Sequence, residues 1–293
     1  MGCKQDVKID LHIHSTASDG TLTPSEILEL AEKLHLGAIS LTDHDAVDGN
    51  RDMLKRGIPC SIGFLTGLEI SALPPPGFPL SGSFHVLGYG IDIEDKALNQ
   101  ALVALQDARK KRNPQIITKL NALGIQIDLN QVEQYSGKCR LGRPHIANYL
   151  VHKGHVGSID DAFDQYLGKG KAAYIEKFRI PCRQAITLIR NAGGLPVLAH
   201  PYLLAPGNVF VFEDLIGELK SMGLKGIEVY YPEHPPEAVD FYTRIAREND
   251  LIITGGTDFH GEIKPEIKLG SGTGNFFVPY EVYEIIMTFL KQG

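Results

Sequence analysis

The fold is indicated first by residues 7–24, which read VKIDLHIHSTASDGTLTP. Val7–Leu11 has the short apolar pattern of a strand, and a polar, glycine-containing loop follows it. Pro24 comes directly after Thr23, and this pair is typical of a helix N-cap followed by proline at the first helical position. The stretch therefore predicts a strand, a loop that begins with two histidines, and a helix that runs to about Leu36.

The alternation of short apolar strands and helices continues along most of the chain. Repeated β–α units of this kind favour a parallel sheet or a barrel, so we expect an α/β fold. Further strands are expected at residues 38–41, 62–68, 84–89, 196–199, 227–230 and 252–254, and further helices at residues 182–192, 213–222, 236–248 and 280–290.

One long stretch interrupts this alternation with helical patterns alone. A long helix is expected from Lys96 to about Ile117, broken or bent at Pro114, because proline lacks the backbone N–H and clashes with the preceding turn. Two shorter helices are expected near residues 144–152 and 159–167. The predicted division is a sheet-containing domain formed by residues 1–95 and 173–293, with a helical insertion at residues 96–172.

The composition is that of a soluble globular protein, because 43% of the 293 residues are apolar and 22% are charged. No run approaches the ~18 uninterrupted apolar residues of a membrane-spanning helix. The net charge of −6 argues against a protein that coats nucleic acid, which needs a basic excess. The four cysteines form no CxxC pair, which argues against a thiolate zinc site. Because the N-terminus lacks an apolar signal region, we expect a cytoplasmic protein.

Histidines and carboxylates gather at the ends of the predicted strands. His12 and His14 end the first strand with one residue between them, so both imidazoles can reach one point. A single His or Asp after a strand is usually a satisfied polar or turn residue. The combination is more specific, because the active sites of barrels lie where the strand ends converge. The nine residues of this kind are His12, His14, Asp19, His44, Glu69, His85, His200, Asp258 and His260.

This cluster predicts a metal centre. Imidazoles and carboxylates brought together without partners are destabilising, whereas divalent cations would satisfy them. Mixed nitrogen and oxygen ligands suit zinc, manganese or iron better than calcium or magnesium. Nine ligands are too many for one ion, so we expect two or three.

In this order, the motifs resemble those of the polymerase and histidinol phosphatase (PHP) family of metal-dependent phosphoesterases. They are Asp10–Ser15 with Ser18–Gly20, Thr42–Asp45, Gly67–Glu69, the strand of His85, Ala199–Pro201 and Asp258–His260. The resemblance implies the PHP fold, which is a distorted (β/α)7-type TIM-like barrel. The insertion resembles that of the small stand-alone members, which act on nucleoside 3′,5′-bisphosphates and AMP, and some on short oligonucleotides. Its matching stretches are Arg109–Arg112, Leu120–Ile125, Gly142–Ala147 and Tyr166–Lys171.

The resemblance also implies a trinuclear centre, with manganese as the first expectation and iron or zinc as alternatives. The implied ligands are His12, His14, Glu69 and Asp258 for the first metal, Glu69 as a bridge with His85 and His200 for the second, and Asp19, His44 and His260 for the third. Asp43 stands beside a ligand and is expected to orient a metal-bound imidazole.

The resemblance finally implies that the insertion caps a substrate pocket. Its substrate-binding residues would be Arg109, Arg112, Arg143, His145 and Lys171. The expected reaction is hydrolysis of a phosphate monoester of a small nucleotide by a metal-bridging hydroxide. The alternatives are a 5′–3′ exonuclease on short RNA, a histidinol phosphatase, and a non-catalytic metal-binding accessory module. Nothing in the sequence indicates a membrane or protein partner.

Overall fold

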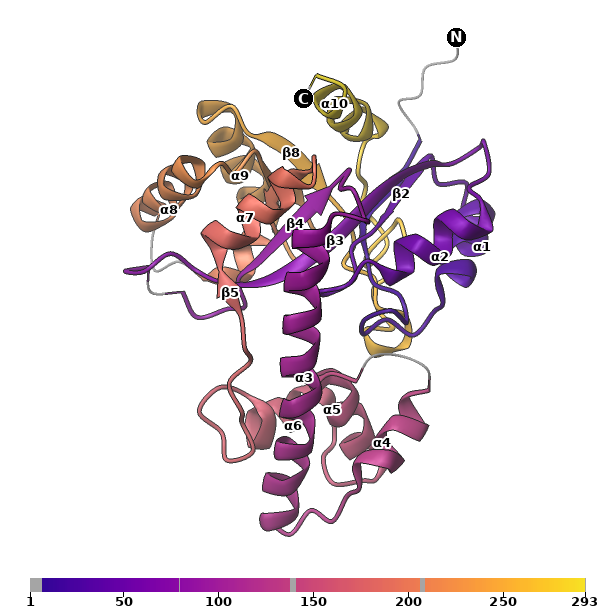
Figure 1. Ribbon diagram of the computed structural model, residues 1–293, viewed down its shortest axis with the longest axis vertical. Coiled ribbons are helices and arrows are strands. Elements are labelled where there is room, and N and C mark those ends of the chain that lie inside the picture. Colours follow the sequence, from indigo (N-terminus) through magenta and orange to yellow (C-terminus); the bar gives the residue numbers. More distant parts are fainter. Residues whose placement is uncertain (1–6, 79, 138–140, 206–208, 293) are drawn as a thin grey trace.

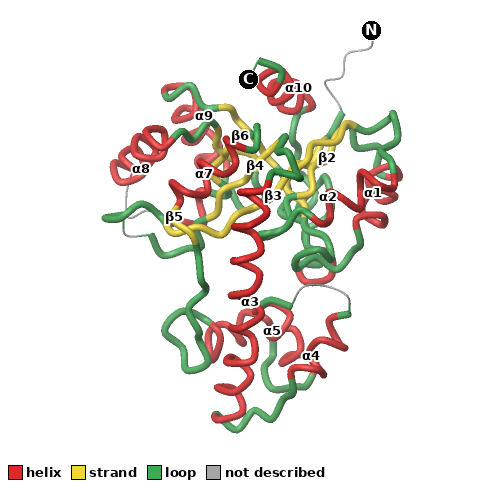
Figure 2. Tube along the Cα trace, viewed as in Figure 1, coloured by secondary structure: helices red, strands yellow, loops and turns green. Residues whose placement is uncertain are grey.

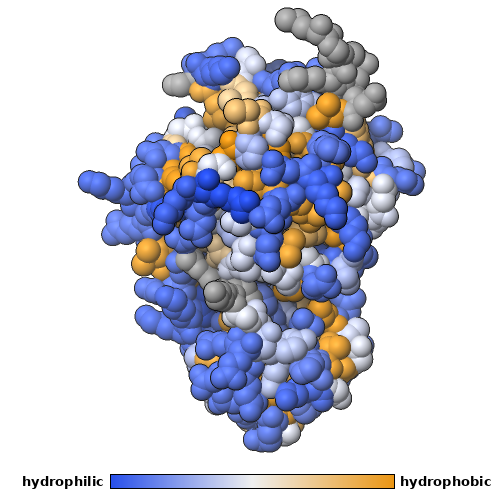
Figure 3. Space-filling model, turned by 90° about the vertical axis from the view of Figure 1, so that its right-hand side faces the viewer, coloured by the Kyte–Doolittle hydropathy of each residue, from blue (hydrophilic) through white to orange (hydrophobic). Residues whose placement is uncertain are grey.

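The molecule has two parts, a sheet covered by helices and a smaller group of helices beside it (Figure 1). The computed structural model describes residues 7–78, 80–137, 141–205 and 209–292. Helix α3 (Lys96–Ala122) runs from one part into the other. Hydrophilic side chains cover much of both parts on the face drawn in Figure 3. Within the described ranges, no helix has the length and apolar content needed to cross a membrane.

The sheet curls into a distorted barrel, as the sequence predicted. Seven strands are hydrogen-bonded in the order β1-β2-β3-β4-β6-β7-β8, and β5 pairs with β3. The curl brings the two ends of this order together, because His14 N donates to Phe259 O at 2.9 Å just beyond β1 and β8. The strands are β1 (Ile9–Ile13), β2 (Ala38–Leu41), β3 (Gly63–Leu73), β4 (His85–Tyr89), β5 (Ile180–Pro181), β6 (Leu195–Leu198), β7 (Gly226–Tyr230) and β8 (Ile252–Gly255).

Strand β4 departs from the expected parallel arrangement. It pairs antiparallel with both β3 and β6, whereas the other pairs of the main order are parallel. The connection from β3 to β4 covers only residues 74–84, and so short a connection cannot carry a crossover helix. The reversal has a functional consequence. His85, the first residue of β4, lies at the same end of the sheet as the last residues of the parallel strands.

Helices cover the outside of the sheet. In Figure 1, α1 and α2 lie on one side, α7, α8 and α9 on the other, and α10 at the end away from the insertion. Thr23 caps α1 as predicted, because its side chain accepts from Glu26 N and the Glu26 side chain accepts from Thr23 N. The helices are α1 (Pro24–Lys33), α2 (Asp48–Arg56), α7 (Cys182–Asn191), α8 (Val209–Met222), α9 (Pro236–Glu248) and α10 (Tyr280–Leu290).

Helix α3 continues through Pro114, so the helix is not broken there, and a break was one of the two expected effects of this proline. The proline removes one backbone hydrogen bond, but both halves of the helix are held by packing. Leu98, Leu102 and Leu105 are buried in the largest core of the barrel part. The second half, beginning at Ile116, is buried in a separate core of the insertion.

The insertion has its own apolar core. Buried residues between Ile116 and Ala173 form one cluster, distinct from the three clusters around the sheet. Figure 2 shows that this part contains helices and loops, with the strands confined to the other part. We propose that residues 96–172 are a helical insertion in a barrel domain. Besides α3 it contains α4 (Leu129–Ser136), α5 (Arg143–His152), α6 (Ile159–Ala162) and the π-helical turn Phe163–Leu167.

Closure of the barrel depends on a close approach at Gly256. A Cβ at this position would lie 2.3 Å from His12 N. We expect Gly256→Ala to lower the free energy of unfolding by about 1–3 kcal/mol, because backbone must move to admit the methyl group. Urea denaturation of the metal-free protein measures the change.

Gly217→Ala is the matched control, because Gly217 is exposed in α8 and its Cβ would meet nothing within 4 Å. The control should raise stability by roughly 0.5–1 kcal/mol. An unchanged unfolding midpoint for Gly256→Ala would contradict the closure described above.

Candidate metal centre

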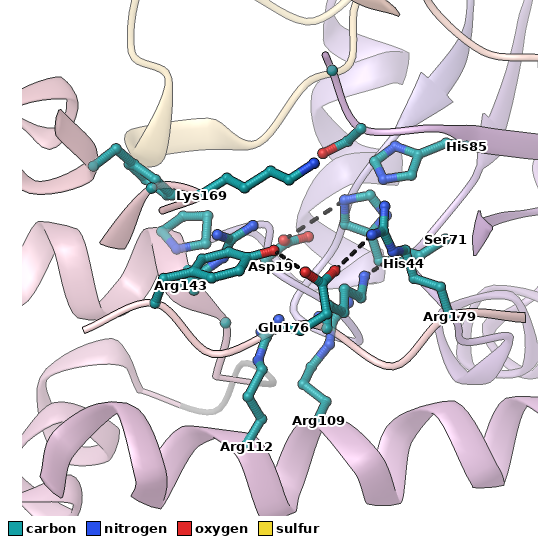
Figure 4. Close-up of a pocket in the computed structure, with 18 of the residues that line it drawn as sticks. Asp19, His44, Ser71, His85, Arg109, Arg112, Arg143, Lys169, Glu176 and Arg179 are labelled. Carbon is teal, nitrogen blue, oxygen red and sulfur yellow. Dashed lines mark hydrogen bonds and ion pairs between the residues drawn. The ribbon is translucent and has the colours of Figure 1, made fainter. Parts of the chain in front are cut away.

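The nine predicted ligands meet at one mouth of the barrel. Eight of them lie on or after β1, β2, β3, β6 and β8 towards the carboxyl ends of these strands, and His85 begins the antiparallel β4. The insertion faces this mouth. In Figure 4, His44 and His85 of the barrel and Arg109 and Arg112 of α3 point toward the same space.

Glu69 lies at the centre of the group and is only 1% exposed. Its Oε1 is 2.8 Å from His85 Nδ1 and 3.0 Å from His200 Nε2. Its Oε2 is 2.8 Å from His44 Nδ1 and 3.4 Å from His14 Nε2. A carboxylate with imidazoles on both sides could share divalent cations with them.

Asp258 and Asp19 join the remaining histidines to this centre. Asp258 Oδ1 is 3.0 Å from His14 Nε2 and 3.4 Å from His12 Nε2. Asp19 Oδ1 is 3.5 Å from His260 Nε2 and 3.7 Å from His14 Nδ1. The nine side chains thus form one continuous cluster.

The donor atoms fit divalent cations. His12 Nε2, His14 Nε2, Asp19 Oδ1 and Glu69 Oε2 are buried, and their short contacts with the described residues do not have the geometry of hydrogen bonds. Such atoms are costly unless something absent from the protein chain satisfies them. Burial lowers the pKa of His14 to about 3, so this imidazole is neutral at pH 7, as metal ligation requires. Potential ligand atoms within 4.8 Å of one another form three groups: His14, Asp19, His44 and His260; His12, His14 and Glu69; and His44, Glu69 and His85.

A basic cavity of about 440 Å³ adjoins the cluster and is lined by residues of both parts of the protein. Its acidic lining residues are Asp19 and Glu176. A phosphate group near the metal ligands would therefore meet mainly cationic side chains. The basic lining residues besides His44 and His85 are Arg109, Arg112, Arg143, Lys169, Lys177 and Arg179.

Two predicted substrate-binding residues do not line this cavity. Lys171 is exposed, and Lys169 lines the cavity instead, because a turn from Gly168 to Lys171 separates the two lysines. His145 is buried, and its Nδ1 accepts from Gly142 N at 3.0 Å at the start of α5. Arg109, Arg112 and Arg143 line the cavity, and their role in substrate binding stays a prediction.

The family was tested by comparison with known proteins. A model of the PHP domain matches residues 10–107. A 3′,5′-nucleoside bisphosphate phosphatase of Chromobacterium violaceum is 32% identical over 86% of this chain and 87% of its own length. The chain belongs to the PHP family. A 5′-3′ exoribonuclease of Haemophilus influenzae is also 32% identical, over 86% of this chain and 90% of its own.

The structural comparison agrees. A solved structure from Bifidobacterium adolescentis, called a metal-dependent phosphoesterase, matches with a TM-score of 0.82 and 27% identity, covering 97% of this chain and 96% of that one. The predictions of PHP membership, of the barrel and of a metal-dependent phosphoesterase are confirmed. This PHP protein is a metal-dependent hydrolase that binds divalent metal ions.

The sequence interpretation missed Glu228, which orients two residues of the PHP centre. Its Oε1 is 2.9 Å from His12 Nδ1, and its Oε2 accepts from His200 N at 2.8 Å. A carboxylate on Nδ1 keeps a proton there and leaves Nε2 free for a metal. Glu228 is fully buried in β7, and an acidic residue within an otherwise apolar strand was the signal available in the sequence.

Asp43, which was expected to orient a metal-bound imidazole, contacts two serines of the loop after β1. Its carboxylate accepts from Ser15 N, Ser15 Oγ and Ser18 Oγ at 2.7, 2.8 and 2.6 Å. Ser18 Oγ lies 3.5 Å from His14 Nδ1, so Asp43 reaches an imidazole through a hydroxyl. It fixes the loop that carries Asp19. We propose that Asp43 positions the centre through this loop.

Glu228→Gln tests the orienting contact. Glutamine has an accepting oxygen and a donating NH2 group in place of the two accepting oxygens of Glu228. The NH2 group must face either His12 Nδ1 or the backbone N–H of His200, so one of the two contacts is lost. We expect metal affinity to fall about 10–100-fold, as for other groups that orient metal ligands. Competition with a fluorescent chelator measures the affinity. Glu218→Gln is the control, because Glu218 is half-buried in α8, where it lies 3.6 Å from Arg183. Equal affinities for the two variants would refute the role of Glu228.

Proposed function

We propose that this PHP protein hydrolyses a phosphate monoester of a nucleotide that carries a second phosphate, a nucleoside 3′,5′-bisphosphate. The proposal depends on the buried guanidinium of Arg112, which has nitrogen atoms without a hydrogen-bond partner among the described residues. Its side chain enters the basic cavity from α3, beside the metal ligands (Figure 4).

Arg112 is buried, and no carboxylate among the described residues forms an ion pair with it. It is 5% exposed, and its Nε and Nη1 have no hydrogen-bond partner among the described residues. Burial, together with the charges of Arg109 and Arg143, lowers its pKa to about 10, and it stays charged at pH 7. A buried guanidinium of this kind is costly unless an anion pairs with it. A second phosphate of the substrate, held away from the metal ions, supplies the anion that pairs with Arg112.

Other basic side chains of the cavity are held in place by contacts within the protein. Lys177 Nζ and Arg109 Nη2 both lie 3.2 Å from Asp45 Oδ2. Arg143 donates to Leu167 O at 3.0 Å and lies over the rings of Phe163 and Tyr174, 5.6 and 5.4 Å from their centroids. Side chains fixed before the substrate arrives lose little entropy on binding, which favours affinity.

The reaction divides between the metal centre and these side chains. When bound, divalent cations supply Lewis acidity toward phosphoryl oxygens and a water of lowered pKa. The nine ligands hold them, and Lys264 Nζ and Tyr231 OH fix Asp258 by contacts of 2.8 and 3.1 Å to its Oδ2. The basic side chains bind and orient the phosphate oxygens, which favours in-line attack.

The number and identity of the ions are part of the proposal. We propose three ions, because the three groups of donor atoms include seven of the nine ligands. The other two lie beside members of these groups, His200 Nε2 at 3.2 Å from His85 Nδ1 and Asp258 Oδ1 at 3.0 Å from His14 Nε2. Manganese is the first choice, and iron and zinc accept the same ligands.

A 5′–3′ exonuclease acting on short RNA is the second candidate. It is supported by the exoribonuclease relative and by a groove of about 860 Å³ that continues past the metal ligands and could hold a longer substrate. The groove is lined by Asp160, Glu233 and Glu266 as well as by Lys264. These carboxylates would repel the phosphates of a polynucleotide, so we rank the small bisphosphate first. Histidinol phosphatase ranks lower because histidinol phosphate carries one phosphate and leaves the second anion site without a ligand. A non-catalytic module ranks lower because it does not require the complete ligand set.

Phosphate release tests the proposal. The metal-stripped protein, reloaded with Mn²⁺, should release inorganic phosphate from adenosine 3′,5′-bisphosphate faster than from AMP. Arg112→Met should raise KM for the bisphosphate about 10–100-fold, since a hydrogen bond to a charged group contributes about 1.5–3 kcal/mol, and leave KM for AMP nearly unchanged. Lys111→Met, exposed on the same helix, is the control.

The alternatives give other products. Release of mononucleotides from short RNA, with no phosphate from the bisphosphate, would favour the exonuclease. Hydrolysis of histidinol phosphate alone would overturn the nucleotide proposal, and no hydrolysis of any ester would favour the accessory module.

The binding of the bisphosphate should weaken above pH 8. Burial lowers the pKa of Lys177 to about 8, although the Asp45 carboxylate opposes the shift. Lys177 is therefore charged below this pH and neutral above it, while a phosphate monoester with its second pKa near ~6 is already fully ionised. KM should rise about tenfold from pH 7 to pH 9, as the protonated fraction falls. Lys177→Arg should keep KM level over this range, and an equal rise in both proteins would exclude Lys177 as the cause.

A further inference from the structure

A second cavity, of about 220 Å³, shares Arg109 and His44 with the basic cavity. From α3 it is also lined by Gln106, Lys110 and Asn113, which lie three or four residues apart and so share one face of the helix. The basic cavity is lined by Arg112, which lies on the neighbouring face of the helix. The two cavities therefore meet at Arg109, beside a metal ligand.

The lining of the second cavity differs from that of the first. Leu129 and Leu141 give it apolar walls, and its volume is below the roughly 300–1,000 Å³ of sites for whole drug-sized ligands. A fragment of a substrate fits it better than a whole substrate. Its cationic lining residues are Arg109 and Lys110, against one carboxylate, so a second phosphate is favoured in the basic cavity instead.

Asn113 supplies a polar group to this cavity. It is 5% exposed, its Nδ2 donates to Leu141 O at 2.8 Å, and its Oδ1 has no partner among the described residues. The bond from Nδ2 fixes the orientation of the amide, so the free group is an acceptor. A buried acceptor without a partner is costly, and a ligand that donates a hydrogen bond would satisfy it.

We infer that this cavity holds the base of the nucleotide substrate and selects an amino-bearing purine, adenine first, by a hydrogen bond from the exocyclic amino group to Asn113 Oδ1. The inference rests on the proposed function. The apolar walls of Leu129 and Leu141 take the ring faces. Arg109, held by Asp45, stands between the base and the phosphates, where a planar guanidinium can contact both. A keto oxygen at the position of the amino group would face the Asn113 oxygen and be repelled.

A matched pair of substrates tests the hydrogen bond. Adenosine 3′,5′-bisphosphate and purine riboside 3′,5′-bisphosphate differ only in the amino group. We expect kcat/KM to be about tenfold higher for the adenosine compound, the effect of one hydrogen bond between neutral groups.

Asn113→Leu should abolish this preference. Asn99→Leu is the control on the same helix, because Asn99 binds Ile93 O and Asp95 O and does not line the cavity. It should keep the tenfold ratio, whatever its effect on stability. A ratio near one in the wild type, or an unchanged ratio in Asn113→Leu, would overturn the inference.

A second variant tests the cavity itself. Leu129→Trp fills it and should raise KM for adenosine 3′,5′-bisphosphate at least tenfold, while leaving KM for an abasic tetrahydrofuran 3′,5′-bisphosphate unchanged. Leu123→Trp, at an exposed position of the insertion, should alter neither value.

The same assays separate the two proposals. Hydrolysis of both bisphosphates with no response to Leu129→Trp would overturn the base site and leave the proposed function standing. Hydrolysis of neither compound by the Mn²⁺-loaded wild type would overturn the proposed function, and the base site with it.

Discussion

The structure depends on one carboxylate, that of Glu69, which lies almost completely buried among the imidazoles of the PHP centre. Its oxygens lie within 3.6 Å of nitrogen atoms from His12, His14, His44, His85 and His200. Removing these groups from water is expensive, and the protein supplies few hydrogen bonds in return. Divalent cations offset that cost, so the barrel mouth and the metal centre are stabilised together. The antiparallel β4 serves the same arrangement, because it brings His85 to the mouth from the start of a strand.

Much of this could be predicted from the sequence, and the failures have physical causes. The succession of strands along the chain follows from the apolar runs, and the expected ligands stand where these runs end in His, Asp or Glu. The direction of β4 did not follow from its pattern, since a buried strand looks the same in either direction. Helix α2 was missed because few of its residues are apolar. Pro114 was expected to break or bend α3, and the helix is not broken because packing of both helix halves outweighs one lost hydrogen bond. Glu228 was missed because its role arises from contacts with residues far away in the chain.

The substrate site joins the two parts of the protein, and Asp45 makes the connection. It follows the ligand His44 and binds Arg109 of α3 and Lys177 of the segment that returns to the barrel. Burial alone would raise the pKa of Asp45, but the charges of Lys177 and Arg109 outweigh this effect and lower the pKa to about 2. The barrel thus supplies the side chains that hold metal ions. The insertion and its connections supply basic side chains and apolar walls for the substrate. Changes in the insertion can alter substrate choice and leave the metal ligands in place, which fits the different activities named among relatives of similar identity.

The central claim is that these nine side chains hold shared divalent cations. Anomalous diffraction from crystals of the Mn²⁺-loaded protein tests it most directly. The account predicts anomalous peaks at the barrel mouth, each in contact with donor atoms of the nine residues, with Glu69 touching two of them. Peaks confined to other sites, or a single ion that does not touch Glu69, would contradict it.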